Sequence, residues 1–429
     1  MENAASNNKQ KGQRRPFAPF YILAAFFVSV YLRLVYGLRL SQKLHIKGPA
    51  IVLCNHPSGL DYLVAIAALF PARLNFIVAY YYFLGNTLAK TLDIMGAIPK
   101  YQFTPDIKAL RKVGNVLHKK NGIVCMMPEG TVYGNAKLSF INPSVIKFIK
   151  HFNVPVYTVN ISGAGVCFPK WAKENRRGKL FATVEKLFDP SEFKGSDNEL
   201  LYHRLVDALS YDDFSYIEKS KFTCHSKKKA EGLERLLSIC PSCGREFTLE
   251  TSKNTISCSC GLCAEIDSSF GFLWHSSPKY FKHYGEWYDY QGEFYKNQIM
   301  RDDFSLSSQV IYITNEPSTG SYVKIGEGVI TLTREGVAFS GTVRGQKHSF
   351  FEPLHSIPAI VIDIGKNFEL PYDGGVRCFE PLEKKSAIKW SLCHRLLYDT
   401  FVGAEPEFSA LSDNSRKRHR SADTVSKDE

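Results

Sequence analysis

Between residues 48 and 210, short apolar runs alternate with longer segments in which apolar residues recur every three or four positions. The short runs are typical of buried strands, and the longer pattern is typical of amphipathic helices. We expect strands at 50–54, 74–79, 96–99, 122–127, 154–161 and 180–184, and helices at 60–70, 86–95, 105–119 and 143–152. This alternation predicts an α/β domain with a largely parallel sheet over residues 48–220.

An uncharged stretch, residues 16–32, precedes this domain and directly follows Arg14 and Arg15. Its length is at the short limit for crossing a bilayer, which takes about 20 residues. We expect residues 1–47 to form a flexible start and a membrane-associated helix that is interfacial or re-entrant. The basic residues after it would meet anionic head groups: Arg33, Arg39, Lys43 and Lys47. The alternative is a helix buried in the protein core.

The pattern changes to short β-type runs from residue 305 to 404. We expect strands at 309–314, 322–325, 328–333, 336–340, 348–352, 360–364, 367–371 and 376–380, followed by an amphipathic helix at 384–401. Antiparallel strands closed by one C-terminal helix resemble a pleckstrin-homology-like domain. Residues 405–429 have too little apolar content to pack, and we expect a disordered tail.

Composition narrows the class of protein. The chain has 429 residues, 44% of them hydrophobic, which is enough for more than one core. Its net charge of +12 favours an anionic partner: a membrane surface, a nucleic acid, or a phosphorylated or CoA-bearing substrate. The 11 cysteines are an odd number, and several stand singly in apolar runs, which disfavours a disulfide framework. We therefore expect the protein to lie at the cytoplasmic face of a membrane, held by a peripheral or re-entrant N-terminal anchor.

The segment from Asn55 to Asp61 carries the first candidate chemistry. His56 directly follows the apolar run at 50–54, and Asp61 comes five positions later, after a turn through Pro-Ser-Gly. A carboxylate that bonds one imidazole nitrogen leaves the other nitrogen free to take a proton from an alcohol. Taken alone, the histidine could equally be a satisfied polar residue near a turn.

Three further segments follow in a fixed order. They are Gly96-Ala97-Ile98-Pro99, Pro128-Glu129-Gly130-Thr131 and the apolar Val154-Pro155-Val156. Together with the His-x-x-x-x-Asp segment, this ordered set resembles the glycerolipid acyltransferase family of lysophosphatidic acid acyltransferases. The resemblance covers roughly residues 17–220.

The resemblance implies acyl transfer from a thioester, acyl-CoA or acyl carrier protein, to the hydroxyl of a lyso-glycerophospholipid. His56 would be the general base, and Asp61 would orient it. The substrate-binding residues would be Asn55, Gly96, Lys100, Glu129, Gly130 and Thr131. Each of the shorter segments also has a simpler interpretation, because 128–130 could be an ordinary turn and Gly96 an ordinary helix C-cap.

The sequence departs from the family at two positions. Arginines of the family that are understood to hold the acceptor phosphate are replaced here by Gln102 and Val132. Neither residue can grip phosphate as a guanidinium does. Lys100 is a possible substitute, and so is the basic segment 169–179, which includes Lys170, Arg176, Arg177 and Lys179. That segment could also be a solvated turn.

Residues 221–304 combine a basic linker, a cysteine-rich stretch and an aromatic hinge. Cys240 and Cys243 have the spacing of a zinc knuckle followed by glycine, and Cys258 and Cys260 precede a second glycine in the same way. Cys263 is the alternative fourth ligand. We expect a zinc ribbon whose four thiolates close the coordination shell, so the zinc would be structural.

The sequence is also compatible with two other functions. The absence of both arginines fits a catalytically lapsed relative that binds lipids or partners. A zinc ribbon in a basic chain also fits a nucleic-acid-binding protein. The aromatic residues near the ribbon are not regularly interleaved with lysine and arginine, which disfavours a nucleic-acid partner.

Overall fold

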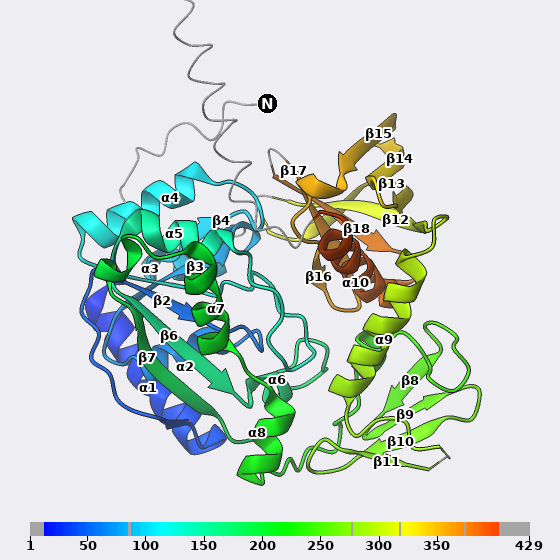
Figure 1. The fold of residues 1–429 in the computed structure, drawn as a ribbon, viewed down its shortest axis with the longest axis horizontal. Helices are drawn as coiled ribbons and strands as arrows, with labels where there is room; N and C mark the ends of the chain where they lie inside the picture. The colour runs from blue at the N-terminus through cyan, green and yellow to red at the C-terminus, as the bar shows by residue number, and fades with distance from the viewer. Residues whose placement is uncertain (1–12, 85–86, 276–277, 317–318, 373–374, 403–429) are drawn as a thin grey trace, which may run out of the picture.

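The computed structural model describes residues 13–84, 87–275, 278–316, 319–372 and 375–402. The expected tail at 405–429 and nearly all of the expected flexible start lie outside the described residues. The chain forms an α/β domain, a small four-stranded sheet and a C-terminal β sheet (Figure 1).

The α/β domain is built on a seven-stranded sheet in the order β1-β7-β6-β2-β5-β3-β4. Every neighbouring pair is parallel except β6 with β7, which is antiparallel. The sheet is therefore mixed, and the expectation that it is largely parallel is confirmed. Its strands are β1 (Arg39–Leu40), β2 (Ala50–Cys54), β3 (Leu74–Ala79), β4 (Ile98–Lys100), β5 (Ile123–Met126), β6 (Val156–Ser162) and β7 (Phe181–Phe188).

Helices cover both faces of this sheet, which explains why β2 is apolar at every position. Ala50, Val52 and Cys54 pack in the hydrophobic cluster that contains α1 (Ala18–Tyr36) and α2 (Asp61–Ala68). Ile51 and Leu53 point the other way, because successive side chains of a strand alternate between faces. They pack with α4 (Ile107–Gly114), α5 (Ser144–Phe152) and α7 (Asn198–Leu209). The domain also contains α3 (Thr87–Ile94), α6 (Ala164–Cys167) and α8 (Asp213–Ser220).

Helix α1 contacts the domain along one stripe only. Its buried residues recur at helical spacing: Tyr21, Ala25, Ser29, Leu32 and Tyr36. The other side exposes large apolar side chains: Phe17, Phe20, Ile22, Leu23, Phe26, Phe27, Tyr31 and Leu34. The alternative of a helix buried in the core is therefore wrong. Among the described residues, α1 is the one helix long and apolar enough to cross a membrane.

The cysteine-rich stretch forms a four-stranded antiparallel sheet in the order β11-β10-β9-β8. Its strands are β8 (Leu249–Ser252), β9 (Thr255–Cys258), β10 (Cys263–Ile266) and β11 (Phe272–Trp274). The sequence did not predict the helix that follows, α9 (Tyr284–Ile299). Figure 1 shows α9 running from this small sheet toward the C-terminal sheet. The aromatic hinge is packed, because Trp287 is fully buried against Phe272, Trp274 and Phe281.

The C-terminal sheet has seven antiparallel strands in the order β15-β14-β13-β12-β18-β17-β16. They are β12 (Leu306–Asn315), β13 (Tyr322–Leu332), β14 (Gly336–Val343), β15 (Gln346–Pro353), β16 (Val361–Asp363), β17 (Asn367–Tyr372) and β18 (Gly375–Pro381). The expected separate strands at 322–325 and 328–333 are one strand, β13, which pairs with β12 through a register shift. Helix α10 (Ala387–Leu397) follows, and a π-helical turn, η7 (Tyr398–Val402), continues it.

One hydrophobic cluster connects these parts. It contains Tyr21 of α1, Trp171 after β6, Trp287 of α9 and Trp390 of α10. Polar contacts add to the junction, since the Arg176 guanidinium lies over the rings of Trp171 and Phe270 and donates to the main chain of Lys229. The α/β domain is therefore held against the rest of the chain by a shared core.

Candidate active site

The strand register brings two of the sequence segments side by side. Strands β2 and β5 are adjacent and parallel, with Leu53 opposite Met126. His56 and Glu129 each lie three residues further along, so both leave the same edge of the sheet. Their loops are joined directly, because the His56 main-chain N–H donates to Glu129 Oε1 over 2.6 Å.

The side chains of His56 and Asp61 form a hydrogen-bonded pair. His56 Nδ1 lies 2.9 Å from Asp61 Oδ2. Asp61 is fully buried, and it also accepts from the Ser58 main-chain N–H at 2.9 Å and from Ser58 Oγ at 2.5 Å. Burial raises the pKa of Asp61, while the bonds from His56 and Ser58 oppose that rise. An Nδ1–H that donates to the carboxylate leaves Nε2 as the basic nitrogen.

Glu129 is buried and holds two loops in place. Its Oε1 accepts from the His56 main chain, and its Oε2 accepts from the Ser139 main-chain N–H at 3.1 Å. Burial raises the pKa of Glu129 to about 7, although the hydrogen bond from the His56 main chain opposes the rise. In this arrangement Glu129 positions the histidine loop and makes no direct contact with the cavity described below.

Asn55 was expected to contact substrate, and its amide is engaged elsewhere. The side chain is fully buried; its Nδ2 donates to the Ile161 carbonyl at 2.8 Å, and its Oδ1 accepts from the Ile161 N–H at 2.7 Å. Both amide groups therefore continue the pairing of β2 with β6, which fixes where the histidine loop begins.

The two glycines of the expected site are required by the backbone. Gly96 ends α3 with φ +64°, and a Cβ there would lie 2.6 Å from the Arg14 carbonyl, so the simpler helix C-cap interpretation fits it. Gly130 has φ +70°, and a Cβ there would lie 2.7 Å from the Phe103 ring. The Gly130 carbonyl accepts from Gln102 Nε2 at 2.5 Å, so Gln102 connects the loop after β4 to the Pro-Glu-Gly-Thr loop.

A cavity of about 1800 Å³ contains His56 and extends to other expected site residues. Lys100, Gly130 and Thr131 line it, as do both residues that replace the family's arginines, Gln102 and Val132. Residues of α1 form an apolar part of its wall: Phe20, Tyr21, Ala24, Ala25 and Val28. An imidazole–carboxylate pair thus lies in a space that is large enough for an amphipathic ligand and has an apolar wall.

Two polar groups of the cavity differ in how they are bonded. Lys100 Nζ donates to the carbonyls of Tyr101 and Thr104, and burial lowers the pKa of its ammonium. Thr131 is buried, and its Oγ1 has no hydrogen-bond partner among the described residues. A buried hydroxyl without a partner is costly, so Thr131 is available to a ligand.

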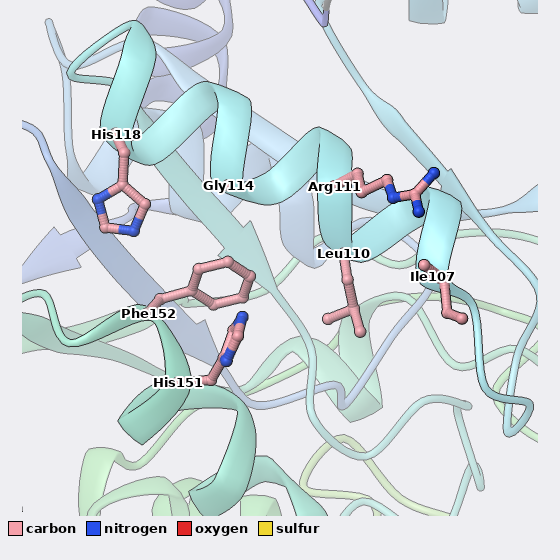
Figure 2. Close-up of a pocket in the computed structure, with 7 residues that line it drawn as sticks. All are labelled: Ile107, Leu110, Arg111, Gly114, His118, His151 and Phe152. Carbon is pink, nitrogen blue, oxygen red and sulfur yellow. The ribbon is translucent and has the colours of Figure 1, made fainter. Parts of the chain in front are cut away.

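A second pocket of about 400 Å³ lies beside the first, between α4 and α5 (Figure 2). Figure 2 shows His118 and His151 on either side of the Phe152 ring, and the Arg111 side chain extending away from it. The pocket shares Leu110 and His151 with the large cavity, but His56 and Asp61 do not line it. We therefore place the candidate chemistry in the large cavity.

The basic segment at 169–179 does not form one anion site. Arg176 is buried and donates to the carbonyls of Val166 and Lys229, so it is neither a phosphate ligand nor part of a solvated turn. Lys170 lines the cavity, and its Nζ donates to the Ile362 carbonyl at 2.8 Å. Arg177 and Lys179 are exposed.

The C-terminal half supplies a wall of the cavity that the sequence did not reveal. His355, Ser356, Pro358 and Val361 line it, together with α10 and η7 residues that include Arg395 and Asp399. Ser58 and Ser139 were also missed. Ser58, three residues before Asp61, could have been recognised as a turn residue that bonds a nearby carboxylate. The C-terminal half reaches the cavity through contacts between residues far apart in the sequence, such as Lys170 with Ile362 and Phe140 with Arg395, and these leave no local signal.

The four expected cysteines meet at one place. The sulfurs of Cys240, Cys243, Cys258 and Cys260 all lie within 4.8 Å of one another. Neighbouring sulfurs in a tetrahedral zinc site with Zn–S bonds of about 2.3 Å lie about 3.8 Å apart. The separations of 3.6 Å for Cys240–Cys260 and 3.9 Å for Cys243–Cys258 therefore fit zinc. Cys263 is not part of this group, and all cysteines in the described part of the chain are free.

Comparison with known proteins gives a family match and similar solved structures. Residues 34–162 match the family model described as Acyltransferase. Among solved structures, the chain is similar to the 1-acyl-sn-glycerophosphate (LPA) acyltransferase PlsC from Thermotoga maritima, at 19% identity and a TM-score of 0.37, over 47% of this chain and 88% of that one. Comparison with curated proteins gives no match. The loops of His56 and Glu129 both lie within the segment that matches the Acyltransferase family model.

Proposed function

We propose that the protein transfers an acyl group from an acyl thioester, either acyl-CoA or acyl carrier protein, to the hydroxyl of a lyso-glycerophospholipid. The observation that carries this proposal is the His56–Asp61 pair, with 2.9 Å between Nδ1 and Oδ2, at a large cavity with an apolar wall. The match of residues 34–162 to the acyltransferase family supports the same reaction class.

In the proposed reaction, the acceptor oxygen attacks the thioester carbonyl carbon while its proton moves to His56 Nε2. The buried Asp61 carboxylate holds the ring and stabilises the imidazolium that forms. The tetrahedral oxyanion then collapses, the C–S bond breaks, and the leaving thiolate takes the proton from His56. The products are the acylated lipid and the free thiol, and no acyl-enzyme is formed.

The cavity lining suggests where the parts of the substrates lie. We assign the apolar wall formed by α1 to acyl chains, because apolar surface is stabilised when it leaves water. Thr131 Oγ1 is a candidate donor to the acceptor or to the oxyanion, since it is buried without a partner among the described residues. Asn55, Gly96 and Glu129 would act by positioning loops.

We further propose that α1 lies in the membrane interface on the cytoplasmic face. Its buried stripe packs on α2, and its exposed side presents a continuous set of large apolar residues that acyl chains could cover in place of water. Arg33 and the basic residues after it would contact anionic head groups. The cavity wall formed by α1 would then open toward the lipid that supplies the acceptor.

For the remaining parts we propose structural roles. Cys240, Cys243, Cys258 and Cys260 would hold a zinc ion in a closed shell of four thiolates, which leaves no position for a reacting water. Arg245 Nε lies 3.4 Å from Cys243 Sγ and would orient that ligand. The C-terminal sheet with its closing helix would be a pleckstrin-homology-like domain, judged by the order of its strands.

The test is turnover by the purified full chain in mixed micelles. Lyso-lipids are offered with oleoyl-CoA or with oleoyl-acyl carrier protein, and diacyl product is measured by mass spectrometry. Product that depends on His56 supports the proposal. Tight lipid binding with no product from either donor would instead support the lapsed relative.

A further inference from the structure

Arg395 and Asp399 form an ion pair that lines the catalytic cavity from the C-terminal half. They are one helical turn apart, in α10 and η7. Arg395 Nε donates to Asp399 Oδ2 at 2.8 Å, and its Nη2 donates to Oδ1. The remaining nitrogen, Nη1, is buried and has no hydrogen-bond partner in the part of the chain that the structure describes.

This ion pair lies at the loop that follows the Pro-Glu-Gly-Thr segment. The Arg395 guanidinium carbon is 3.4 Å from the centre of the Phe140 ring, which fixes the side chain on that loop. Charges of both the ion pair and the Glu129 site act on Tyr133. Burial raises the pKa of Tyr133 to about 12, the Arg395 charge opposes the rise, and the charges of Glu129 and Asp399 add to it. Phe140 directly follows Ser139, whose main-chain N–H donates to Glu129 Oε2. The ion pair therefore contacts the loop that Glu129 binds, and the Glu129 carboxylate also holds the His56 loop.

We propose that Arg395 and Asp399 recognise the head group of a zwitterionic lysophospholipid. The Arg395 Nη1 donor would bind the phosphate, and the Asp399 carboxylate, which is 48% exposed, would face the ammonium group. This inference rests on the proposed acyl transfer and names the acceptor of that reaction. It also accounts for a cavity in which glutamine and valine stand where the family has arginines.

The charges of the cavity favour a zwitterion over a phosphomonoester. A phosphomonoester carries close to two negative charges at neutral pH. It would meet the Asp399 carboxylate beside Arg395, the one arginine among the described residues that line the cavity. Lys100 and Lys170 are already hydrogen-bonded to main-chain carbonyls, and Lys147, which also lines the cavity, is engaged in an interaction of its own. A guanidinium and a carboxylate side by side have no net charge, and they match a phosphate and an ammonium held one short linker apart.

The experiment compares three acceptors with the same acyl chain in the full-length protein: lysophosphatidylethanolamine, lysophosphatidic acid and monoacylglycerol. The wild-type protein should acylate lysophosphatidylethanolamine with a kcat/KM roughly tenfold above that for lysophosphatidic acid, the size expected for one charged contact. Asp399→Asn should remove most of that preference. Arg395→Gln should lower kcat/KM roughly tenfold for both phosphate-containing acceptors and much less for monoacylglycerol, which has no phosphate.

Arg301→Gln is the matched control, because Arg301 forms the same kind of bidentate pair with Asp303 on the surface and does not line the cavity. It should leave all three rates unchanged. A wild-type preference for lysophosphatidic acid, or an Asp399→Asn variant with unchanged acceptor ratios, would overturn the head-group assignment while acyl transfer stands. Absence of turnover with all acceptors and donors would overturn the proposed function, and this inference with it.

Discussion

His56 has its Nδ1 hydrogen-bonded to the buried Asp61 carboxylate, and the residue lines the large cavity. Replacing His56 by alanine removes the proposed base, and we expect kcat to fall by about 10²–10⁴, the usual contribution of general base catalysis. Asp61→Asn should also lower kcat strongly, because an amide can no longer fix the tautomer with Nε2 free. Steady-state kinetics with circular dichroism as a folding check measures both effects.

An appropriate control is His225→Ala, since His225 is exposed and does not line the cavity. That variant should keep the wild-type rate. A folded His56→Ala protein with the wild-type kcat would exclude the proposed base.

Glu129 makes stability depend on pH. Burial raises its pKa from the ordinary 4.5 to about 7, so between these values the unfolded chain has lost the proton while the folded chain retains it. Glu129 therefore lowers the free energy of unfolding progressively as pH rises from about 4.5 to about 7, by about 3 kcal/mol in total. Below that window both states are protonated and the penalty is absent.

The Glu129→Gln variant tests this sign. The free energy of unfolding is measured by chemical denaturation at pH 5 and pH 8. From pH 5 to pH 8 the wild type should lose about 2.5 kcal/mol of stability relative to the variant, because part of the penalty is already present at pH 5. Asp213, whose pKa burial likewise raises to about 7, is present in both proteins and cancels in the comparison. Equal pH dependence in the two proteins would refute the shifted carboxyl.

The sequence predicted those parts of the site whose residues lie close together along the chain. His56 and Asp61 are five positions apart around one turn, so their meeting could be foreseen. The role of Glu129 could not, because it depends on the register of β2 against β5 and on the loop containing Ser139. Arg395 reaches the cavity only through the packing of the C-terminal half, and the motifs contain no sign of it.

At the scale of elements, α1 has two faces with different roles, and the exposed face predicts membrane binding. Phe26→Glu with Phe27→Glu places two charges on that face and leaves the buried stripe intact. Each phenyl group withdrawn from lipid costs about 2 kcal/mol, and tenfold in affinity corresponds to about 1.4 kcal/mol. We expect binding to anionic vesicles, measured by sedimentation, to fall by at least roughly tenfold.

Phe351→Glu is the matched control for this face. Phe351 lies on β15 and is 53% exposed, compared with 62% for Phe27, so the change in surface chemistry is similar. Vesicle binding should be unchanged by this substitution. If it fell as much as in the α1 variant, binding would not be specific to α1.

The four-stranded sheet β8–β11 carries the proposed zinc site, and one experiment distinguishes Cys258 from Cys263 as its fourth ligand. Cys258→Ser should lose the stoichiometric zinc that we expect in the wild type, whereas Cys263→Ser should retain it, because the Cys263 side chain lies outside the sulfur cluster. Elemental analysis by mass spectrometry measures the metal, and a chelator should lower the melting temperature of the wild-type protein. Zinc retained by Cys258→Ser and lost by Cys263→Ser would reverse the assignment.

The elements that the sequence predicted well are those with a single dominant pattern. Strand β2 is buried on both faces, so its continuous apolar run indicated a strand directly. Helix α9 was missed because its buried residues are mostly tyrosine and tryptophan, mixed with charged positions, and they do not form a clear apolar period. The two runs joined in β13 were separated by Gly326, which lies inside the strand against the Thr342 main chain.

At the scale of the whole molecule, the α/β domain depends on the rest of the chain for part of its core. Trp171 is fully buried, with its ring 5.3 Å from that of Tyr284, and the Arg176 guanidinium lies between Trp171 and Phe270. A chain ending at Ser220 would lose Tyr284 and Phe270. It would expose Trp171 to water and leave the buried Arg176 without its Lys229 acceptor.

We therefore expect a chain ending at Ser220 to aggregate or to unfold without a cooperative transition, while the full chain unfolds cooperatively. An exposed large aromatic costs up to about 3 kcal/mol, and total domain stabilities are about 5–15 kcal/mol, so losing several such contacts removes much of the margin. Light scattering and calorimetry on the two chains make the comparison. Trp171→Ala in the full chain should lower the melting temperature in the same direction, because it leaves a cavity at the junction. A monomeric, cooperatively folding 1–220 chain that acylates lyso-lipids would show instead that the α/β domain needs the C-terminal half neither for stability nor for turnover.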